Sequence, residues 1–301
     1  MAALVFVMAC APRLAAQAPT RLDDFFLPGT QPETIQDPIR SMHECELCHG
    51  YFDPATEPLR PWQASLMGQA GRDPLFRAAL TIANQDASFA GDLCLRCHTP
   101  AGWLEGRSTP TDGSALIAKD FEGVSCNVCH RVVDPVPRDD YEPNDPLAVD
   151  RDILDALDEL PLQPNSGNYV IDPYDRRRGP YDLLDFGLHA WLQSPYVRQS
   201  AFCGTCHDVS NPVFTRQPDG SYAFNDPNTP HPTQNKYDQF PIERTFSEWA
   251  ASAFAQGPID MGGRFGGNQP AVSTCQDCHM PATGGYGSPL GEFRADLPTH
   301  Y

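Results

Sequence analysis

The chain has 301 residues, of which 39 are Asp or Glu and 21 are Lys or Arg, so its formal net charge is −18. This acidic balance opposes binding to the phosphate backbone of nucleic acids, and we expect no nucleic-acid partner. Beyond the N-terminus, no stretch approaches the roughly 18 apolar residues of a membrane-spanning helix, so we also expect no transmembrane span.

The first 18 residues have the pattern of an export signal. Ala2–Ala11 is a short apolar stretch, and Ala16-Gln17-Ala18 fits the small-x-small site of a signal peptidase. A lipoprotein signal is the alternative, because Val7-Met8-Ala9-Cys10 resembles a cleavage box in which Cys10 becomes a lipid anchor. Both interpretations lack a basic n-region. Both predict a periplasmic or extracellular protein, and the second predicts a membrane-associated lipoprotein.

Five copies of Cys-x-x-Cys-His use ten of the eleven cysteines. One helical turn places residues i, i+3 and i+4 on the same side, so two thiols and one imidazole face the same ligand. The thiols can bond to the vinyl groups of a haem while the histidine becomes the proximal iron ligand. The predicted attachment residues are Cys45, Cys48, Cys94, Cys97, Cys126, Cys129, Cys203, Cys206, Cys275 and Cys278, with His49, His98, His130, His207 and His279 as proximal ligands.

Paired cysteines also occur in zinc sites, disulfide frameworks and thioredoxin-like redox centres. A tetrahedral zinc site usually needs two Cys-x-x-Cys pairs, and five is an odd number for that scheme. Zinc also gives no reason for a histidine after every second cysteine. Disulfide frameworks are expected mainly in chains shorter than about 100 residues. The pattern therefore favours five covalently attached haems c.

Few segments between the motifs show a regular pattern, since 31 prolines and 23 glycines are scattered along the chain. Apolar residues at three- and four-residue steps predict helices over 62–67, 74–84, 151–160, 183–192 and 246–255. Pro218-Asp219-Gly220 between Val213–Thr215 and Tyr222–Phe224 predicts one small β-hairpin. The predicted fold class is mostly α with extensive loops, organised around stacked haems.

The spacing of the motifs predicts one multihaem domain over residues 19–301. Haems 1–3 fall in 41–131, an insertion covers 132–200, and haems 4 and 5 fall in 201–301. The acidic, proline-rich part of the insertion, Asp134–Pro164, is interpreted as a solvated loop, with a lid or partner surface as alternatives. Truncation at the C-terminus, after Tyr301, is left open.

The sequence has fewer candidate histidines for the distal iron positions than it has predicted haems. Five proximal histidines leave only His43, His189, His231 and His300 for five opposite faces, so at least one iron lacks a distal imidazole. His43 lies too close to Cys45 to reach round its own haem, so we expect it to bind a neighbouring one. Met67 is a further candidate, because a thioether ligand would raise the potential of its haem. The alternative for each of these histidines is a structural or surface role.

The motifs and their settings resemble the exported multihaem c-type cytochromes of the cytochrome c-552/4 type, a family of electron carriers. The resemblance covers about Ser41 to Tyr301. It implies close-packed haems and largely histidine ligation, without identifying one partner. Familiar tetrahaem carriers have fewer motifs. The settings that carry it are Cys94-Leu-Arg-Cys-His-Thr-Pro, Gly123-Val-Ser-Cys-Asn-Val-Cys-His, Cys203-Gly-Thr-Cys-His-Asp and Cys275-Gln-Asp-Cys-His-Met-Pro.

We therefore expect an exported pentahaem cytochrome that transfers single electrons, rather than an enzyme with its own substrate. Its negative charge favours redox partners with cationic docking surfaces. One alternative is an oxidoreductase that acts on a small nitrogen or sulfur compound at an open haem, although no Cys-x-x-Cys-Lys variant is present. The other alternative is a filament-forming extracellular cytochrome, which would carry the same motifs.

Overall fold

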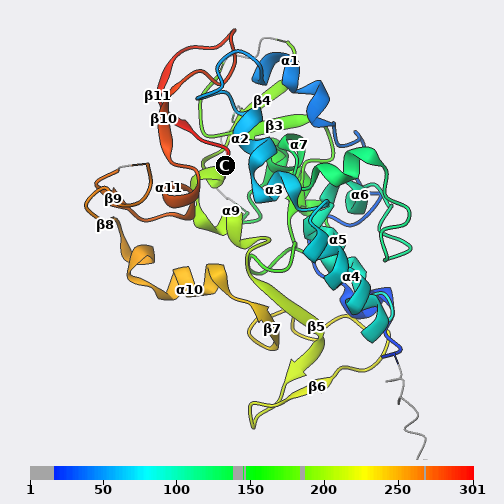
Figure 1. Ribbon diagram of the computed structural model, residues 1–301. Helices are drawn as coiled ribbons and strands as arrows, with labels where there is room; N and C mark the ends of the chain where they lie inside the picture. The colour runs from blue at the N-terminus through cyan, green and yellow to red at the C-terminus, as the bar shows by residue number, and fades with distance from the viewer. Residues whose placement is uncertain (1–16, 138–144, 146, 184–186, 268) are drawn as a thin grey trace, which may run out of the picture.

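The computed structural model describes residues 17–137, 145, 147–183, 187–267 and 269–301. Within these residues the chain forms eleven α-helices, nearly all of them short, and eleven strands in five small sheets (Figure 1). Helical residues account for 33% of the described residues and strands for 16%. The predicted mostly helical architecture around stacked haems is therefore wrong. Backbone groups that the prediction left in loops instead pair as short strands, which satisfies their hydrogen bonds.

The N-terminal half is helical and contains the first three motifs. Its α-helices are α1 (Glu46–His49), α2 (Leu59–Ala64), α3 (Leu66–Gln69), α4 (Pro74–Asp86), α5 (Gly91–His98), α6 (Pro100–Leu104) and α7 (Cys126–Cys129). Single 3-10 turns cover Leu22–Phe25, Met42–Glu44 and Ala118–Glu122.

The second half alternates short helices with paired strands. The helices are α8 (Ala148–Asp155), α9 (Ser200–Gly204), α10 (Thr245–Ala251) and α11 (Cys275–His279), with 3-10 turns at Pro195–Arg198 and Ala253–Gln256. The strands are β1 (Val132–Val133), β2 (Val170–Ile171), β3 (Arg176–Gly179), β4 (Ala190–Gln193), β5 (Val209–Arg216), β6 (Tyr222–Phe224), β7 (Gln239–Glu243), β8 (Ile259–Asp260), β9 (Ala271–Val272), β10 (Ala282–Gly285) and β11 (Arg294–Pro298). The pairs β1–β2, β8–β9 and β10–β11 are antiparallel, whereas β3–β4 is parallel.

The helix predicted over 74–84 is confirmed as α4. Asp73 caps it by accepting a hydrogen bond from the Leu75 N–H, and Pro74 occupies the first helical position, where no N–H is needed. The segment predicted over 62–67 is instead two helices, α2 and α3. They are separated at Ser65, which adopts an extended conformation and caps α3 through the Gly68 N–H.

The helix predicted over 183–192 is wrong. The described residues of that segment include β4, which pairs in parallel with β3 through the register Arg177 to Trp191. Gly187 has a φ of +74°, which a right-handed helix does not accommodate. The helices predicted over 151–160 and 246–255 are present as α8 and α10. Their bounds differ from the prediction, since α8 ends at Asp155 and α10 at Ala251.

The predicted hairpin forms, with Phe214 of β5 opposite Phe224 of β6. It is not the isolated hairpin that the pattern indicated, because β7 pairs with the other edge of β5 and makes a three-stranded sheet in the order β6-β5-β7. This sheet projects from the lower end of the molecule in Figure 1.

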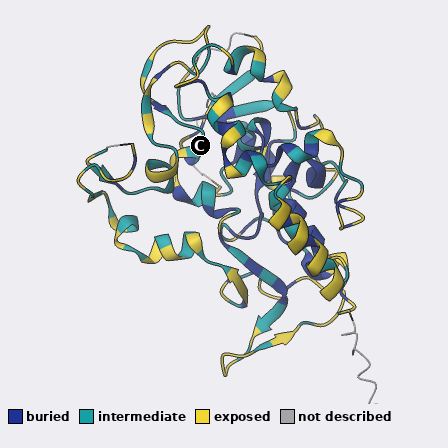
Figure 2. Cartoon of the chain, viewed as in Figure 1, coloured by how far each residue is buried: buried dark blue, intermediate teal, exposed yellow. Residues whose placement is uncertain are grey.

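The main hydrophobic core lies between the second and third motifs, as the dark helices in Figure 2 show. Leu95 of α5, Trp103 of α6 and Val128 of α7 are all almost completely buried there. Arg96 is buried with them, its guanidinium 4.3 Å from the Trp103 ring centroid and hydrogen-bonded to three backbone carbonyls, so its polar groups are satisfied. The core thus fixes two motif helices relative to each other.

Part of the predicted insertion is ordered. α8 buries Ile153 and Leu154 in a second small core, and its Asp150 forms a buried ion pair with Arg178 of β3. Residues 138–144 and 146 of the predicted loop lie outside the described residues, as do residues 1–16 of the predicted export signal. In the part of the chain that the structure describes, none of the helices has the length and apolarity needed to cross a membrane.

Candidate haem-binding site

Each Cys-x-x-Cys-His motif lies in or beside a short helix. α1, α5 and α11 end on the motif histidine, α7 ends one residue before it, and α9 covers the start of the fourth motif. The backbone N–H groups of His49, His130 and His207 each donate to the carbonyl of the first cysteine in their own motif, at 2.9–3.0 Å. This i to i+4 bond brings both thiols and the imidazole to one side of the turn, as covalent attachment of a haem requires.

Thiols from different motifs lie in contact. All ten motif cysteines are free, and among the described residues no three His, Cys, Asp or Glu side chains gather to hold a bare metal ion. Interactions between thiol side chains link the motifs in pairs: Cys45 with Cys126, Cys97 with Cys206, and Cys203 with Cys275. Motif 1 is therefore beside motif 3, and motif 4 is beside motifs 2 and 5.

Three of the five proximal histidines are oriented by backbone carbonyls. A carbonyl oxygen only accepts, so each of these bonds places the imidazole proton on Nδ1 and leaves Nε2 free to bind a metal. The bonds from Nδ1 run from His49 to Gly287 O (2.7 Å), from His130 to Arg178 O (2.7 Å) and from His98 to Ala70 O (3.3 Å).

Two of the four histidines proposed as distal ligands face a motif histidine. The ring centroids of His49 and His189 lie 6.5 Å apart with planes inclined at 35°, and those of His130 and His300 lie 6.4 Å apart at 33°. Parallel stacking brings ring centroids closer than this, as in the 4.0 Å pair of Phe76 with His98, whereas tilted aromatic pairs span about 4.5–7 Å. The separation fits a direct tilted contact of the two rings, and it equally fits a ligand between the two rings of each pair.

The size of that gap matches a shared metal. Metal–imidazole nitrogen distances are about 2.0–2.1 Å, and a ring nitrogen lies about 1.1 Å from its ring centre, so two imidazoles on opposite sides of one ion have centroids about 6.2–6.4 Å apart. The observed centroid separations are 6.5 Å for His49 with His189 and 6.4 Å for His130 with His300, close to the upper end of this range. His49 and His130 belong to motifs whose thiols touch, so the two pairs are neighbours as well.

The surroundings keep these imidazoles neutral. Burial lowers the pKa of His300 to about 4, and the nearby rings of His130 and His49 lower it further. Burial is also the largest cause of the lowered pKa of His130, His49 and His189. A neutral imidazole is the form that binds a metal, because the lone pair must be free.

His189 carries a second mark of a ligand position. Its Nδ1 atom is buried and lies near the Ala190 backbone, but it forms no hydrogen bond of normal geometry with the described residues. A buried nitrogen without a partner is costly unless something else binds it. His189 was expected on a helix; it lies instead directly before β4, and the β3–β4 pairing holds it opposite His49.

The other two distal candidates are placed differently. His231 is buried, but Nε2 lies 3.0 Å from the Thr215 hydroxyl and Nδ1 accepts from the Thr233 backbone N–H at 3.3 Å, so both nitrogens are engaged. The side chain of His43 is 67% exposed and lies 3.2 Å from Glu46. Neither residue is brought to a motif imidazole, and their ligand roles stay predictions.

Met67 lies on α3, which is next to the second motif. The Ala70 carbonyl of the same segment accepts the hydrogen bond from His98 Nδ1, and the Met67 carbonyl accepts one from the Val124 N–H. The Met67 side chain is half-buried. Its thioether role at a haem stays a prediction.

The motif histidines His98, His207 and His279 differ from the other two. Among the described residues, no second imidazole lies opposite any of them at the separation seen for His49 and His130. The ring of Phe76 stacks parallel on His98 instead, with centroids 4.0 Å apart. Three of the five predicted irons therefore have no imidazole in place on the distal side.

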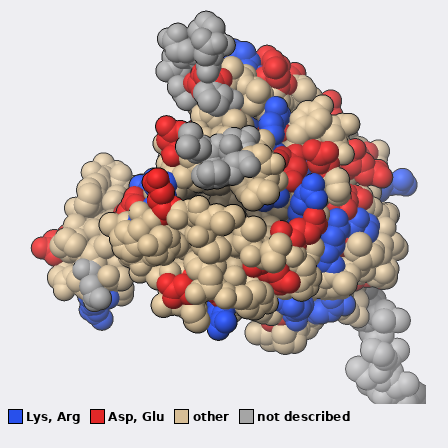
Figure 3. Space-filling view, turned by 90° about the horizontal axis from the view of Figure 1, so that it is seen from above, with Lys and Arg blue, Asp and Glu red and all other residues tan. Residues whose placement is uncertain are grey.

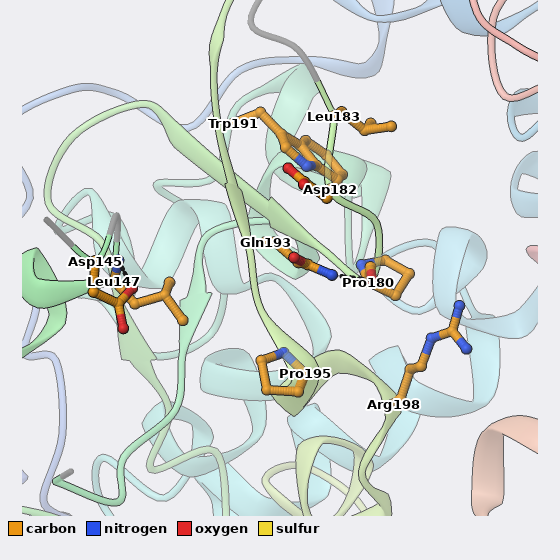
Figure 4. Close-up of a pocket in the computed structure, with 9 residues that line it drawn as sticks. All are labelled: Asp145, Leu147, Pro180, Asp182, Leu183, Trp191, Gln193, Pro195 and Arg198. Carbon is orange, nitrogen blue, oxygen red and sulfur yellow. Dashed lines mark hydrogen bonds between the residues drawn. The ribbon is translucent and has the colours of Figure 1, made fainter. Parts of the chain in front are cut away.

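A cavity of about 760 Å³ lies beside Trp191, and its volume is in the range of small-molecule and cofactor sites. Trp191 forms part of its wall, and the Trp191 ring centroid lies 6.1 Å from that of His130 and 6.5 Å from that of His189. Figure 4 shows Asp182 close to Trp191, Gln193 beside Pro180, and Arg198 farther along the wall. The remaining lining residues are Asp145, Leu147, Pro180, Leu183 and Pro195.

Two residues near these histidines were missed by the sequence analysis, namely Trp191 and Arg177. Trp191 lies within the segment 183–192, which was predicted as a helix. Arg177 belongs to the run Arg176-Arg177-Arg178 in a chain with few basic residues. That run was the sequence feature that could have drawn attention to Arg177.

No protein-family model matches the chain, and no curated protein or solved structure matches it. The assignment of a function therefore depends on the motifs and on the geometry of their side chains.

Proposed function

We propose that the protein is an exported pentahaem c-type cytochrome that passes single electrons between redox partners, of the kind that the cytochrome c-552/4 resemblance implies. The observation that carries the proposal is the pair of imidazole couples, His49 with His189 and His130 with His300, at the spacing of two ligands on one metal. Each couple joins a motif histidine to a histidine far away in sequence, which a motif alone would not produce.

The chain's own residues would hold the haems in a defined order. The thiols of each motif form the attachment points, the backbone carbonyls of Gly287 and Arg178 fix the orientation of two proximal imidazoles, and burial keeps those imidazoles neutral. When bound, the haem irons supply the one-electron chemistry. Contacts between motifs 1 and 3, 2 and 4, and 4 and 5 support transfer between neighbouring groups.

Charge supports a cationic partner. On the face seen in Figure 3, acidic and basic side chains crowd one side of the molecule, and much of the remaining surface in this view is uncharged. The chain as a whole has a formal charge of −18, to which the carboxylates of bound haems would add. A positively charged docking surface on the partner would be attracted over a Debye length of about 8–10 Å.

A second function is favoured by the three motifs without a facing imidazole. An iron at His98, His207 or His279 with a free distal position could bind a small nitrogen or sulfur compound, as an oxidoreductase requires. The electron-transfer proposal stands first because the two completed couples lie side by side.

The test is to express the chain with a c-type cytochrome maturation system and count haems by intact mass and by the pyridine haemochrome spectrum. We expect five covalently bound haems, with two of them low-spin and bis-imidazole in the EPR spectrum. A product with intact free thiols and no haem would contradict the proposal. A high-spin signal that changes on adding nitrite or hydroxylamine would move the oxidoreductase ahead.

A further inference from the structure

The side chain of Arg177 lies on the same face of the β3–β4 ribbon as the paired imidazoles. Arg176 and Arg178 both form ion pairs with Asp172, on the opposite face. Because side chains alternate along a strand, Arg177 points to the other side. There it is directly opposite Trp191, its register partner, whose ring is next to both His130 and His189.

The backbone of β3 fixes this position. The N–H of Arg178 donates to the His130 carbonyl at 2.6 Å, and the Arg178 carbonyl accepts from His130 Nδ1 at 2.7 Å. Arg177 is therefore the chain neighbour of Arg178, whose backbone forms two hydrogen bonds with His130 of the third motif. Its side chain is only 15% exposed, so water screens its charge weakly.

The electrostatic effect of Arg177 reaches both couples. Its register partner Trp191 has its ring centroid 6.1 Å from that of His130 and 6.5 Å from that of His189, so the charge of Arg177 lies beside one imidazole of each couple. The charges around it are Asp175, which binds Arg177 at 3.2 Å, and Arg40, which binds both Asp175 and Glu44.

We propose that Arg177 is an electrostatic tuning residue, which raises the reduction potentials of the two haems bound at His49 and His130 together. This inference rests on the proposed function. Adding one electron to an iron removes one positive charge from the site, and no proton is needed. A buried cation nearby disfavours the oxidised, more positive state and so favours the reduced state.

Asp175 should act in the opposite direction on the same haems, because it is the counter-charge of Arg177. This opposition separates an electrostatic role from a structural one. Arg177→Gln and Asp175→Asn both break the same ion pair, so a structural effect would shift the potentials in the same direction. An electrostatic effect would shift them in opposite directions.

The experiment is an EPR-monitored redox titration of the haem-loaded variants, with a soluble reductant as the electron source. The haems are assigned through His189→Ala and His300→Ala. We expect Arg177→Gln to lower the reduced-to-oxidised ratio of two haems about tenfold at fixed potential, which is 59 mV for one electron. Asp175→Asn should raise it, and Arg177→Lys, which keeps the charge, should stay close to wild type.

The matched control is Arg176→Gln, whose side chain binds Asp172 on the other face, and it should leave the two potentials unchanged. Equal shifts in the same direction for Arg177→Gln and Asp175→Asn, or no shift in either, would overturn the inference. Should Arg177→Gln fail to fold, Arg177→Lys and Asp175→Asn alone decide it. If the wild-type chain takes up no haem at all, it is the proposed function that fails.

Discussion

The imidazole of His300, the penultimate residue, lies 6.4 Å from that of His130 between ring centroids. Figure 1 shows the C-terminus near the middle of the molecule, where β10 and β11 approach the motif helices. β11 is held there by its pairing with β10, through Ala282 opposite Pro298, and the Thr299 N–H adds a bond to the Pro281 carbonyl. The last residues of the chain thus complete a candidate iron site begun by the third motif.

Removal of His300 should therefore open one haem without disturbing the other couple. In His300→Ala we expect one low-spin haem to become high-spin, because the iron loses a strong-field ligand, while the signal of the His49–His189 couple remains. EPR of the oxidised holoprotein measures both species.

His231→Ala is the matched control for this change. His231 is also buried, but its nitrogens are bonded to Thr215 and Thr233 rather than placed opposite a motif imidazole. Its spectrum should keep the wild-type spin states. Loss of a low-spin signal in His231→Ala, together with none in His300→Ala, would mean that the couples are assigned to the wrong residues.

The sequence indicates the candidate ligands more directly than it indicates the fold. Cys-x-x-Cys-His is a local motif, so the helical turn and the proximal histidines follow from the order of residues. The histidines His189 and His300 could be named from the shortage of ligands, but their partners depend on the β3–β4 and β10–β11 pairings. Such pairings bring together distant residues and have weak local signals in two- to five-residue strands.

The fold class failed for a related reason. The segment 183–192 has apolar residues at helical spacing, yet Gly187 takes a left-handed conformation and residues 190–193 pair with β3. Tertiary pairing overrides propensity in so short a segment. By contrast, α4 has a capping aspartate, a proline at the first position and an amphipathic pattern that all agree, and it was predicted correctly.

The buried ion pair of Arg178 with Asp150 and Asp172 should be essential for stability. All three side chains are at most 2% exposed, so Arg178→Met would leave Asp150 as an unpaired buried carboxylate. Loss of one partner of a buried pair costs about 3–5 kcal/mol. We expect a large drop in the urea midpoint of the holoprotein, followed by near-UV circular dichroism.

The exposed pair of Arg198 with Asp296 provides the comparison, since the two side chains are 54% and 57% exposed. Arg198→Met should change the free energy of unfolding by less than about 1 kcal/mol. Equal losses of unfolding free energy for Arg178→Met and Arg198→Met would show that burial does not determine how much the Arg178 ion pairs contribute to stability.

Gly91, the first residue of α5, should tolerate no side chain. An added Cβ would lie 2.0 Å from the Thr111 carbonyl oxygen and 2.5 Å from the Asn84 amide nitrogen, both of which are hydrogen-bonded to each other. Gly91→Ala must therefore displace the helix that carries the second motif, at a cost of about 1–3 kcal/mol.

Thermal unfolding of the holoprotein measures this cost, and Gly291→Ala is the control, because its nearest neighbour would lie at 3.4 Å. We expect a clear loss of stability for the first substitution and little change for the second. A wild-type melting temperature in Gly91→Ala would mean that α5 and the Thr111 segment pack less tightly than the structure has them.

The acidic surface should govern the rate at which partners reduce the protein. The chain has a formal charge of −18. Attraction therefore accelerates its encounter with a cationic electron carrier, and repulsion slows its encounter with an anionic carrier. Raising the ionic strength from 0.01 M to 0.15 M shortens the Debye length from about 30 Å to about 8 Å. Stopped-flow reduction by a small cationic carrier should therefore become slower with added salt, and reduction by an anionic carrier of similar potential should become faster. Rates that do not depend on salt with either carrier would show that the haem edges are approached through an uncharged part of the surface, such as the one visible in Figure 3.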